Sequence, residues 1–322
     1  MSAPSCAMLL EQYLAFRDSL LSHGAGLVEK LTFANVGNRD VYNITVPFMD
    51  EGTLILAGRV EERESEFSEV RFFANEAGSW KPANGYPSFA LQDPFITFIH
   101  GELIFGGVRV VTDDAAPSRI ISWVTEFYRG PSVRRLRHFF TGPNRMKDIR
   151  LVQLRDKRIG VLTRPQGEVG GRGQIGFTMM DRLEELSSVR LVDAPIFTNQ
   201  FLSTEWGGSN EARLLSNGWI GVLGHIASFG TMGDKNYYPI TFAVNPLTRE
   251  STPPKIVATR ADFLPGPAKN PTLGNVVFAG GLVRRDDGLA DLYAGTSDVE
   301  AQRLTITDPF VEYENLPDIM KH

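Results

Sequence analysis

The residues best suited to chemistry in this 322-residue chain are one aspartate and two basic side chains near predicted turns. Asp93 stands directly before a proline, which bars helix, and an alternating apolar run follows. Lys147 and Arg164 flank one predicted hairpin, so they would lie close together. Two cations beside a carboxylate suit a bound phosphate, because arginine binds it bidentately and lysine acts as a point charge. These residue types point to a site in which an anion faces a carboxylate.

Several further residues are candidates for the same site. Arg59 and Glu61 alternate along a predicted strand, so they would share one face. His225 and Asp298 each follow an apolar run, and Trp206, beside two glycines, could be a platform on which a sugar stacks. The other four histidines do not cluster with His225, so we predict no metal site.

Each candidate also has an ordinary structural alternative. Asp93 could cap the turn before the proline, and Lys147 and Arg164 could form a solvated rim. The Arg-x-Glu pair could be a surface ion pair, the histidine and the tryptophan could be core residues, and Asp298 could form a turn. Segment 171–176 fits the glycine pattern of dinucleotide-binding proteins, but a strand-like run follows it, so we predict a flexible loop over the site.

Composition excludes several classes of protein. A net charge of -5 argues against a nucleic-acid binder that depends on phosphate contacts. The single cysteine, Cys6, excludes an internal disulfide framework and suggests a reducing compartment. The sequence has no apolar run of 18 residues, so we expect no membrane-spanning helix and a cytoplasmic protein.

The elements that must position these residues are mostly short strands. Residues 6–23 have helical periodicity, and five predicted hairpins follow. Their turn centres lie 50, 56, 60 and 70 residues apart, at Glu51, Gly101, Lys157, Asn217 and Asp287. Each interval has room for two more strands. Four strands in each of five repeats predict an all-β fold, a five-bladed β-propeller with a short N-terminal helix.

The chain shows no composition break, so we predict a single domain over residues 1–322. A pair of β-sandwiches is the alternative, but it leaves the regular spacing unexplained. In equivalent blades, the outer ends of all five hairpins would meet on one face and form a charged concave site. The polar residues at those ends are Arg59, Glu61, Asp93, Asn144, Lys147, Asp148, Arg164, Glu211, His225 and Asp298.

These strand ends resemble the motifs of glycoside hydrolase family 130, the inverting β-mannoside phosphorylases, which are five-bladed propellers. The matching segments, in chain order, are Arg59-Val60-Glu61, Gln92-Asp93-Pro94-Phe95-Ile96-Thr97, Lys147-Asp148 with Arg164-Pro165, Gly218 to His225, and Asn275 to Phe278 with Gly295-Thr296-Ser297-Asp298. The chain departs from the pattern at Phe95, where the family has arginine, and at Leu223-Gly224-His225, where it has Tyr-His-Gly.

Met146 to Arg150, with segments 163–167 and 170–177, are more similar to a related family of uncharacterised domains. Its trypanosomatid members, placed in glycosyltransferase family 108, are mannosyltransferase/phosphorylases that build and degrade β-1,2-mannan.

The resemblance implies a catalytic role for Asp93 as general acid and base. It implies that Lys147, Arg164 and His225 hold phosphate, and that sugar hydroxyls are bound by Arg59, Glu61, Asn144, Asp148, Glu211 and Asp298. The substrates would be mannose or oligomannosides with phosphate or mannose 1-phosphate, and GDP-mannose stays open as a donor. No cofactor would be needed beyond inorganic phosphate as co-substrate.

Two other functions stay open. A hydrolase would need a second carboxylate to activate water, and Glu61, Glu211 or Asp298 could supply it. A propeller of this kind could also bind carbohydrate without catalysis.

Overall fold

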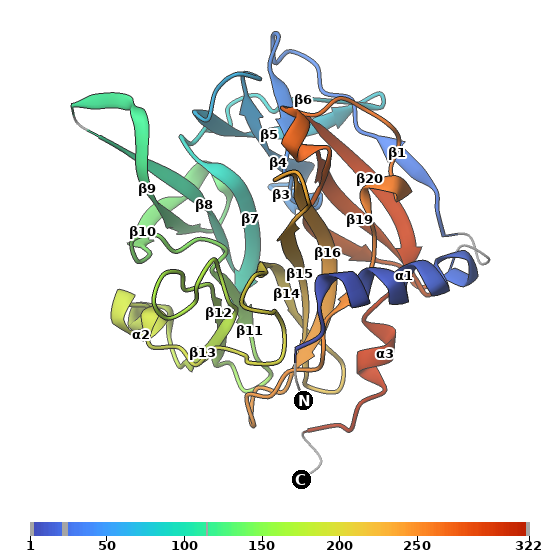
Figure 1. Cartoon of the computed structure of the whole chain (residues 1–322). Coiled ribbons are helices and arrows are strands. Elements are labelled where there is room, and N and C mark those ends of the chain that lie inside the picture. The colour runs from blue at the N-terminus through green and yellow to red at the C-terminus, as the bar shows by residue number, and fades with distance from the viewer. Residues whose placement is uncertain (1–2, 21–24, 114, 320–322) are drawn as a thin grey trace.

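The computed structural model describes residues 3–20, 25–113 and 115–319, and most of its elements are β-strands (Figure 1). Helix α1 (Cys6–Leu20) confirms the predicted start, whereas the predicted end at His23 lies outside the described residues. Leu9 is buried, but the apolar side chains of Met8 and Phe16 in the same helix are exposed. The reason is that α1 rests on β15 and β17 through one narrow face.

All five predicted hairpins are present. They are β3–β4 (Phe48–Asp50, Thr53–Glu61), β7–β8 (Gln92–Ile99, Glu102–Asp113), β11–β12 (Arg150–Gln153, Ile159–Thr163), β14–β15 (Trp206–Leu214, Ile220–Phe229) and β18–β19 (Asn275–Arg284, Leu289–Thr296). Positive φ at both central residues of Glu51-Gly52 and His100-Gly101 gives the type I′ geometry that matches strand twist.

Further strands extend each hairpin. They are β2 (Asp40–Tyr42), β5 (Ser68–Glu76), β6 (Ser79–Pro82), β9 (Ala116–Gly130), β10 (Arg137–Thr141), β13 (Gly176–Met180), β16 (Lys235–Val244), β17 (Lys255–Ile256), β20 (Glu300–Thr307) and β1 (Val28–Lys30). The third hairpin gains only β13, so the expectation of four strands in every repeat is wrong there. The fourth and fifth groups share one sheet, because β16 and β18 pair in parallel over two residues.

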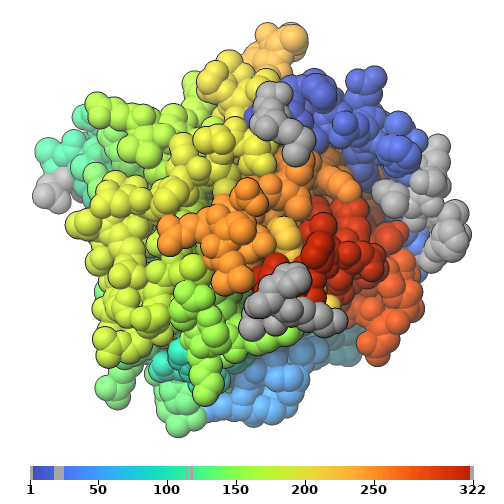
Figure 2. All heavy atoms as spheres, turned by 90° about the horizontal axis from the view of Figure 1, so that it is seen from below, coloured from blue at the N-terminus to red at the C-terminus, as the bar shows by residue number. Residues whose placement is uncertain are grey.

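The core is divided into clusters that lie between successive strand groups. Each of five clusters contains residues from two successive groups, and the last contains residues from the fifth group and the first. Examples of residues that share a cluster are Phe72 and Phe105, Ile104 and Ile149, Leu162 and Val222, Leu223 and Val277, and Phe73 and Tyr293. Seen from below, green and yellow middle segments occupy one side and the red C-terminal segment the other (Figure 2). The described residues include no helix of the length and apolarity needed to cross a membrane.

Candidate active site

Asp93 is a buried carboxylate held by side chains from other strands. A bulge in the β7–β8 pairing begins at Gln92, and Asp93 adopts a left-handed backbone with φ 48°. Its Oδ1 accepts hydrogen bonds from Nδ2 of Asn43 at 2.7 Å and Nη1 of Arg59 at 3.1 Å. The carboxylate therefore bonds side chains from distant parts of the sequence and does not cap the local turn.

The charges around Asp93 favour its ionised form. Burial alone would raise the pKa of this carboxyl, but the charges of Arg59 and Lys147 and the hydrogen bond from Asn43 hold it below its ordinary value. None of the hydrogen bonds found in the described part of the chain uses Oδ2. One carboxylate oxygen is therefore fixed, and the other is free for a substrate.

Arg59 and Glu61 share one face of β4, as expected, and they are buried, so they are not a surface pair. Arg59 donates to Oε2 of Glu61 at 2.5 and 3.0 Å and stacks over the ring of Tyr42, 5.0 Å from its centroid. The Tyr42 hydroxyl donates to Oε1 of Glu61 at 2.7 Å. Lys269, which sequence reasoning missed, forms a second ion pair with Glu61.

Asp298 follows β19 and lies at the same end of the site. Its charged neighbours are Arg59, Asp93, Lys269 and Glu66. Burial raises the pKa of this carboxyl to about 6, since it outweighs the favourable charges of Arg59 and Lys269. Like Asp93, Asp298 has a left-handed backbone, with φ 54°.

A cavity of about 660 Å³ contains both cations predicted to hold phosphate. Its charged lining residues, among those described, are all basic: Arg145, Lys147, Arg164, Arg172 and Lys235. The Arg164 side chain is 3 % exposed, and its Nε donates to the Gly207 carbonyl at 2.5 Å. Its buried Nη1 has no hydrogen-bond partner, so this donor is available to an anion.

Gly208 marks the point where three predicted residues converge. A Cβ atom there would lie 2.6 Å from Oδ2 of Asp148, 2.9 Å from Cδ of Arg164 and 2.9 Å from Cε1 of His225. Only glycine leaves room for this arrangement, which explains the glycine at position 208.

Asp148 balances the buried cations at this point. Its carboxylate lies 3.4 Å from Nε of Arg164 and 4.0 Å from Nε2 of His225, and neither oxygen has a hydrogen-bond partner. Burial opposes ionisation, but the charges of Arg164 and Lys147 hold the pKa of Asp148 below its ordinary value.

His225 is buried and neutral. Its Nδ1 lies 2.9 Å from Oδ1 of Asn210, and its ring stacks on Tyr237 at 5.5 Å. Burial lowers the pKa of His225 to about 3, although Asp148 acts in the opposite direction. With Nδ1 donating to Asn210, Nε2 is an acceptor that faces the side of Asp148.

The structure does not bring every predicted residue together. Asn144 lines the cationic cavity and is bonded by Ser122. Glu211 instead lines a second cavity of about 290 Å³, where it pairs with Arg213 and accepts the Leu282 amide at 2.7 Å. A bulge between Ser209 and Glu211 shifts the side-chain alternation, which separates Glu211 from the other predicted residues.

The cavity wall includes Trp206 and part of segment 171–176, for which the sequence allowed both a structural and a functional interpretation. Trp206 is 5 % exposed, and its Nε1 donates to the Tyr237 hydroxyl at 2.9 Å, so it is both a core and a lining residue. Segment 171–176 lies beside the cavity and leads into strand β13, as expected. Its Arg172 stacks over the ring of Phe229, 4.7 Å from the centroid.

Asn43, Arg150, Arg172, Lys235 and Lys269 are site residues that sequence reasoning missed. Arg150 is buried, donates to the Asn210 carbonyl at 2.7 Å and lies 4.2 Å from the centroid of Phe95. Burial lowers its pKa to about 10. Among the described residues, no group of three His, Cys, Asp or Glu side chains could hold a metal ion.

Fold and site together define a mostly β chain in which a carboxylate lies opposite a cationic cavity. Residues 24–312 match the family described as "Protein of unknown function (DUF1861)", and the chain belongs to that family. A comparison with curated proteins gave no significant match.

Two solved Leishmania mexicana structures are similar along nearly the whole chain. MPT-4, a mannose phosphorylase in complex with a phosphate ion, shares 36% identity with a TM-score of 0.85, over 94% of each chain. MPT-1, a GDP-Man-dependent mannosyltransferase, shares 33% identity with a TM-score of 0.84, over 98% of this chain and 99% of its own. The resemblance and the prediction of an enzyme of the phosphorylase and glycosyltransferase class are confirmed.

A β-1,2-mannobiose phosphorylase from Listeria innocua, at 11% identity and a TM-score of 0.60 over 89% of this chain and 92% of its own, shares the fold.

Proposed function

We propose that this chain catalyses inverting glycosyl transfer on β-mannosides, by reversible phosphorolysis and synthesis of β-1,2-mannan oligosaccharides with mannose 1-phosphate. The observation that carries the proposal is one buried carboxylate, Asp93, with a free oxygen and a cavity nearby whose charged lining residues are all basic. The phosphate-bound mannose phosphorylase at 36% identity supports phosphate as the anion.

In phosphorolysis, Asp93 gives its proton to the glycosidic oxygen, directly or through a sugar hydroxyl. Phosphate, held by Lys147 and Arg164 and donating its own hydroxyl to Nε2 of His225, attacks C1 from the opposite face as the C1–O bond breaks, which yields mannose 1-phosphate and a shortened oligosaccharide. Synthesis reverses these steps with Asp93 as the base. One carboxylate is enough, because phosphate is already an anionic nucleophile.

Bound phosphate would also change the pKa of the catalytic acid, Asp93. The charge of Lys147 helps to lower the pKa of Asp93. A phosphate dianion beside Lys147 offsets that charge, so its arrival raises the pKa of Asp93 and favours the proton that phosphorolysis requires. Arg59, Glu61 and Asp298 lie at the Asp93 end and would bind sugar hydroxyls, whereas Asn144 and Asp148 lie at the phosphate end.

A five-bladed β-propeller is the architecture that we propose for this site. It is supported by five hydrophobic clusters that link the strand groups in a closed cycle, with the fifth group joined to the first. Such a cycle would turn the outer ends of the hairpins toward one axis and bring Asp93, Asp148 and Asp298 close to it.

GDP-mannose is a second candidate donor. The cavity of about 660 Å³ and its five cations exceed what one phosphate needs, and the GDP-Man-dependent relative is 33% identical. Among candidates for a hydrolytic base, Glu61 is tied to Arg59 and Lys269 and Glu211 lies in another cavity, which leaves Asp298.

The test incubates the protein with mannose and either mannose 1-phosphate or GDP-mannose and looks for oligomannosides by chromatography. Asp93→Asn should remove product while oligosaccharide binding persists. If neither donor gives product and both proteins bind oligosaccharide equally, the chain is a binding protein. Release of free mannose from oligomannoside without phosphate would establish hydrolysis instead.

A further inference from the structure

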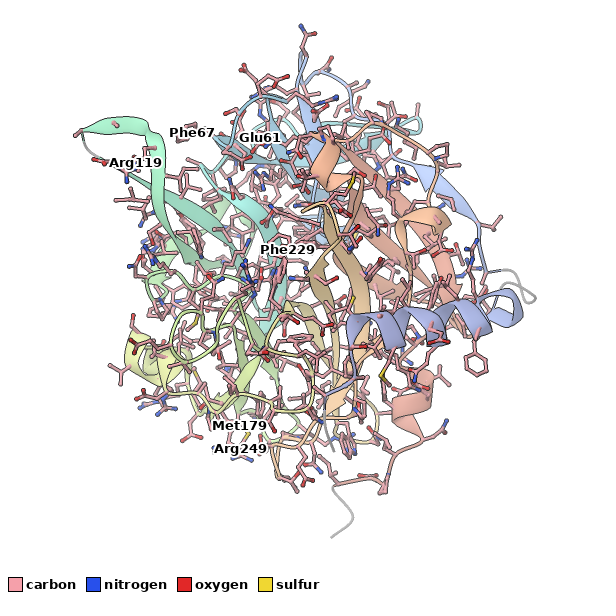
Figure 3. The ribbon with its side chains drawn as sticks, in the orientation of Figure 1. Glu61, Phe67, Arg119, Met179, Phe229 and Arg249 are labelled. Atoms are coloured by element: carbon pink, nitrogen blue, oxygen red, sulfur yellow. The ribbon has the colours of Figure 1, made fainter. Side chains whose placement is uncertain are left out.

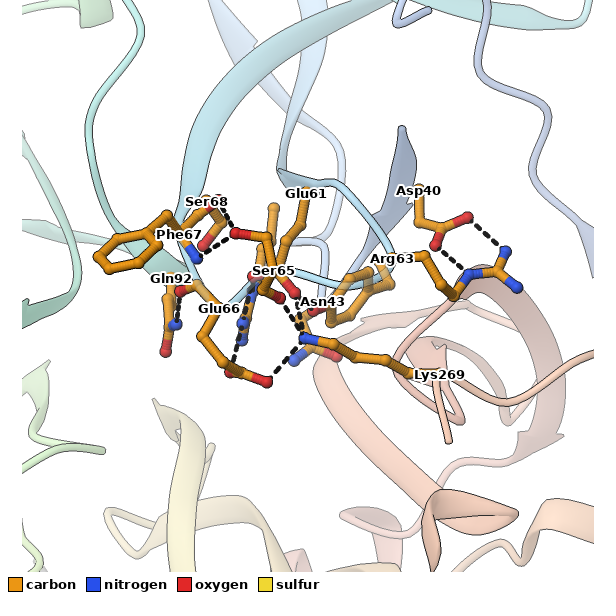
Figure 4. A network of polar contacts seen from close by, with 12 residues as sticks. Asp40, Asn43, Glu61, Arg63, Ser65, Glu66, Phe67, Ser68, Gln92 and Lys269 are labelled. Atoms are coloured by element: carbon orange, nitrogen blue, oxygen red, sulfur yellow. Dashed lines mark hydrogen bonds and ion pairs between the residues drawn. The ribbon is translucent and has the colours of Figure 1, made fainter. Parts of the chain in front are cut away.

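The connection between β4 and β5, residues 62–67, takes part in a network of polar contacts with Gln92 and Lys269 (Figure 4). Nζ of Lys269 donates to the Ser65 carbonyl at 2.6 Å and to Oε1 of Glu66 at 2.8 Å, and it also pairs with Glu61. Nε2 of Gln92 donates to the Glu66 carbonyl at 2.7 Å. Glu66 is therefore held by a residue adjacent to Asp93 in sequence and by a residue more than two hundred positions away.

Glu66 differs from its partners in exposure. Its side chain is 60% exposed, whereas those of Lys269, Arg59 and Glu61 are 8%, 6% and 1% exposed. Its Oε2 lies 3.6 Å from Nη2 of Arg59, the same guanidinium that bonds Asp93. Glu61 and Phe67, at the two ends of this connection, lie near one another in Figure 3. Glu66 is thus more exposed to solvent than the residues it contacts at the Asp93 end.

The two ends of the site carry opposite charge. The Asp93 end contains four carboxylates and two cations: Asp93, Glu61, Glu66 and Asp298 with Arg59 and Lys269. It has a net charge of -2 when all are ionised, whereas the charged lining residues of the phosphate cavity are all basic. A neutral sugar can use carboxylates as hydrogen-bond acceptors, but a sugar with its own carboxylate meets repulsion there.

We propose that Glu66 is a specificity-determining residue that makes the Asp93 end accept neutral sugars and reject sugars bearing a carboxylate. Lys269 holds the Glu66 side chain in place through its hydrogen bond to Oε1. The contact of Glu66 with Arg59, which also bonds Asp93, keeps the Glu66 carboxylate close to the proposed sugar site. This inference rests on the proposed glycosyl transfer, because it assigns the sugar to the Asp93 end.

Two matched substrate pairs test it: mannose 1-phosphate against mannuronic acid 1-phosphate as donors, and mannose against mannuronic acid as acceptors. The measured quantity is the ratio of kcat/KM for the acidic sugar to that for the neutral one. Glu66→Gln should raise this ratio about tenfold in at least one pair, since it removes a charge but keeps the shape. The pair that responds identifies the sugar that faces Glu66.

Glu64→Gln is the matched control, because Glu64 is an exposed acid in the same connection, and it should leave both ratios unchanged. An unchanged ratio in both pairs for Glu66→Gln, with a wild type that makes product from the neutral sugars, would overturn this inference alone. A wild type that makes no product from neutral sugars contradicts the proposed function itself.

Discussion

Asn43 offers a way to change the pKa of Asp93 without removing a charge. Its Nδ2 donates to Oδ1 of Asp93 at 2.7 Å, and both residues are buried, so water cannot replace the bond freely. A hydrogen bond to a charged group contributes about 1.5–3 kcal/mol. At about 1.4 kcal/mol per pKa unit, its loss should raise the pKa of Asp93 by about 1–2 units. Asn43→Gly suits the test because Asn43 has φ 45°, which glycine adopts without strain.

The assay is the pH dependence of kcat/KM in both directions. Synthesis uses ionised Asp93, so its rate falls as pH drops through the Asp93 pKa, and the variant should lose activity at a higher pH. Phosphorolysis uses protonated Asp93, so its rate should persist to a higher pH in the variant.

Asn35→Gly is the control, because Asn35 has φ 61° but is exposed and makes none of these contacts. Profiles for Asn43→Gly that match the wild type in both directions would refute the role of Asn43 in setting this pKa.

Three further outcomes follow from the same geometry. Inorganic phosphate at a hundred times its Kd should stabilise the protein by about 2.7 kcal/mol in thermal melts, and Lys147→Met should reduce that shift; an equal shift in both proteins would argue against the phosphate site. Asp148→Asn should cost about 3–5 kcal/mol in urea unfolding, because it leaves Arg164 without its buried counter-charge; a wild-type midpoint would contradict this pairing. Folding lowers the pKa values of Asp93 and Asp148 below the unfolded value of 3.8. The stability that these carboxylates contribute is therefore present above pH 3.8 and is lost as pH falls from there through their folded-state pKa values. Acid titration of Asp93→Asn should show a smaller loss of unfolding free energy than the wild type.

The hairpins could be predicted because their signals are local. Turn pairs such as Glu51-Gly52 and strand alternation are encoded within a few residues. The parallel pairing of β16 with β18 and the missing fourth strand of the third group depend on contacts between distant segments, which a repeat count does not contain.

The candidate site was predictable where residues stand at strand ends. Asp93, Arg59 and Arg164 follow from the position of the hairpins. The structure pairs Arg59 with Asp93, and it places Arg164 in the cavity that contains Lys147, whose charge acts on Asp93. Lys269 was missed because it lies in an irregular segment whose reach depends on tertiary packing. Glu211 was misplaced because one bulge changes the direction of every later side chain, and sequence gave no sign of the bulge.

Backbone conformation links the three central acids. Asp93, Asp148 and Asp298 belong to three different strand groups, yet all adopt left-handed φ values of 48°, 59° and 54°. That conformation costs a residue other than glycine about 1–2 kcal/mol, and aspartate tolerates it better than most. A turn alone could use glycine at lower cost, so the fold does not explain a carboxylate at each of the three positions. The requirement is the carboxylate itself: each one borders buried cations, and the conformation that presents it is retained at the expense of stability.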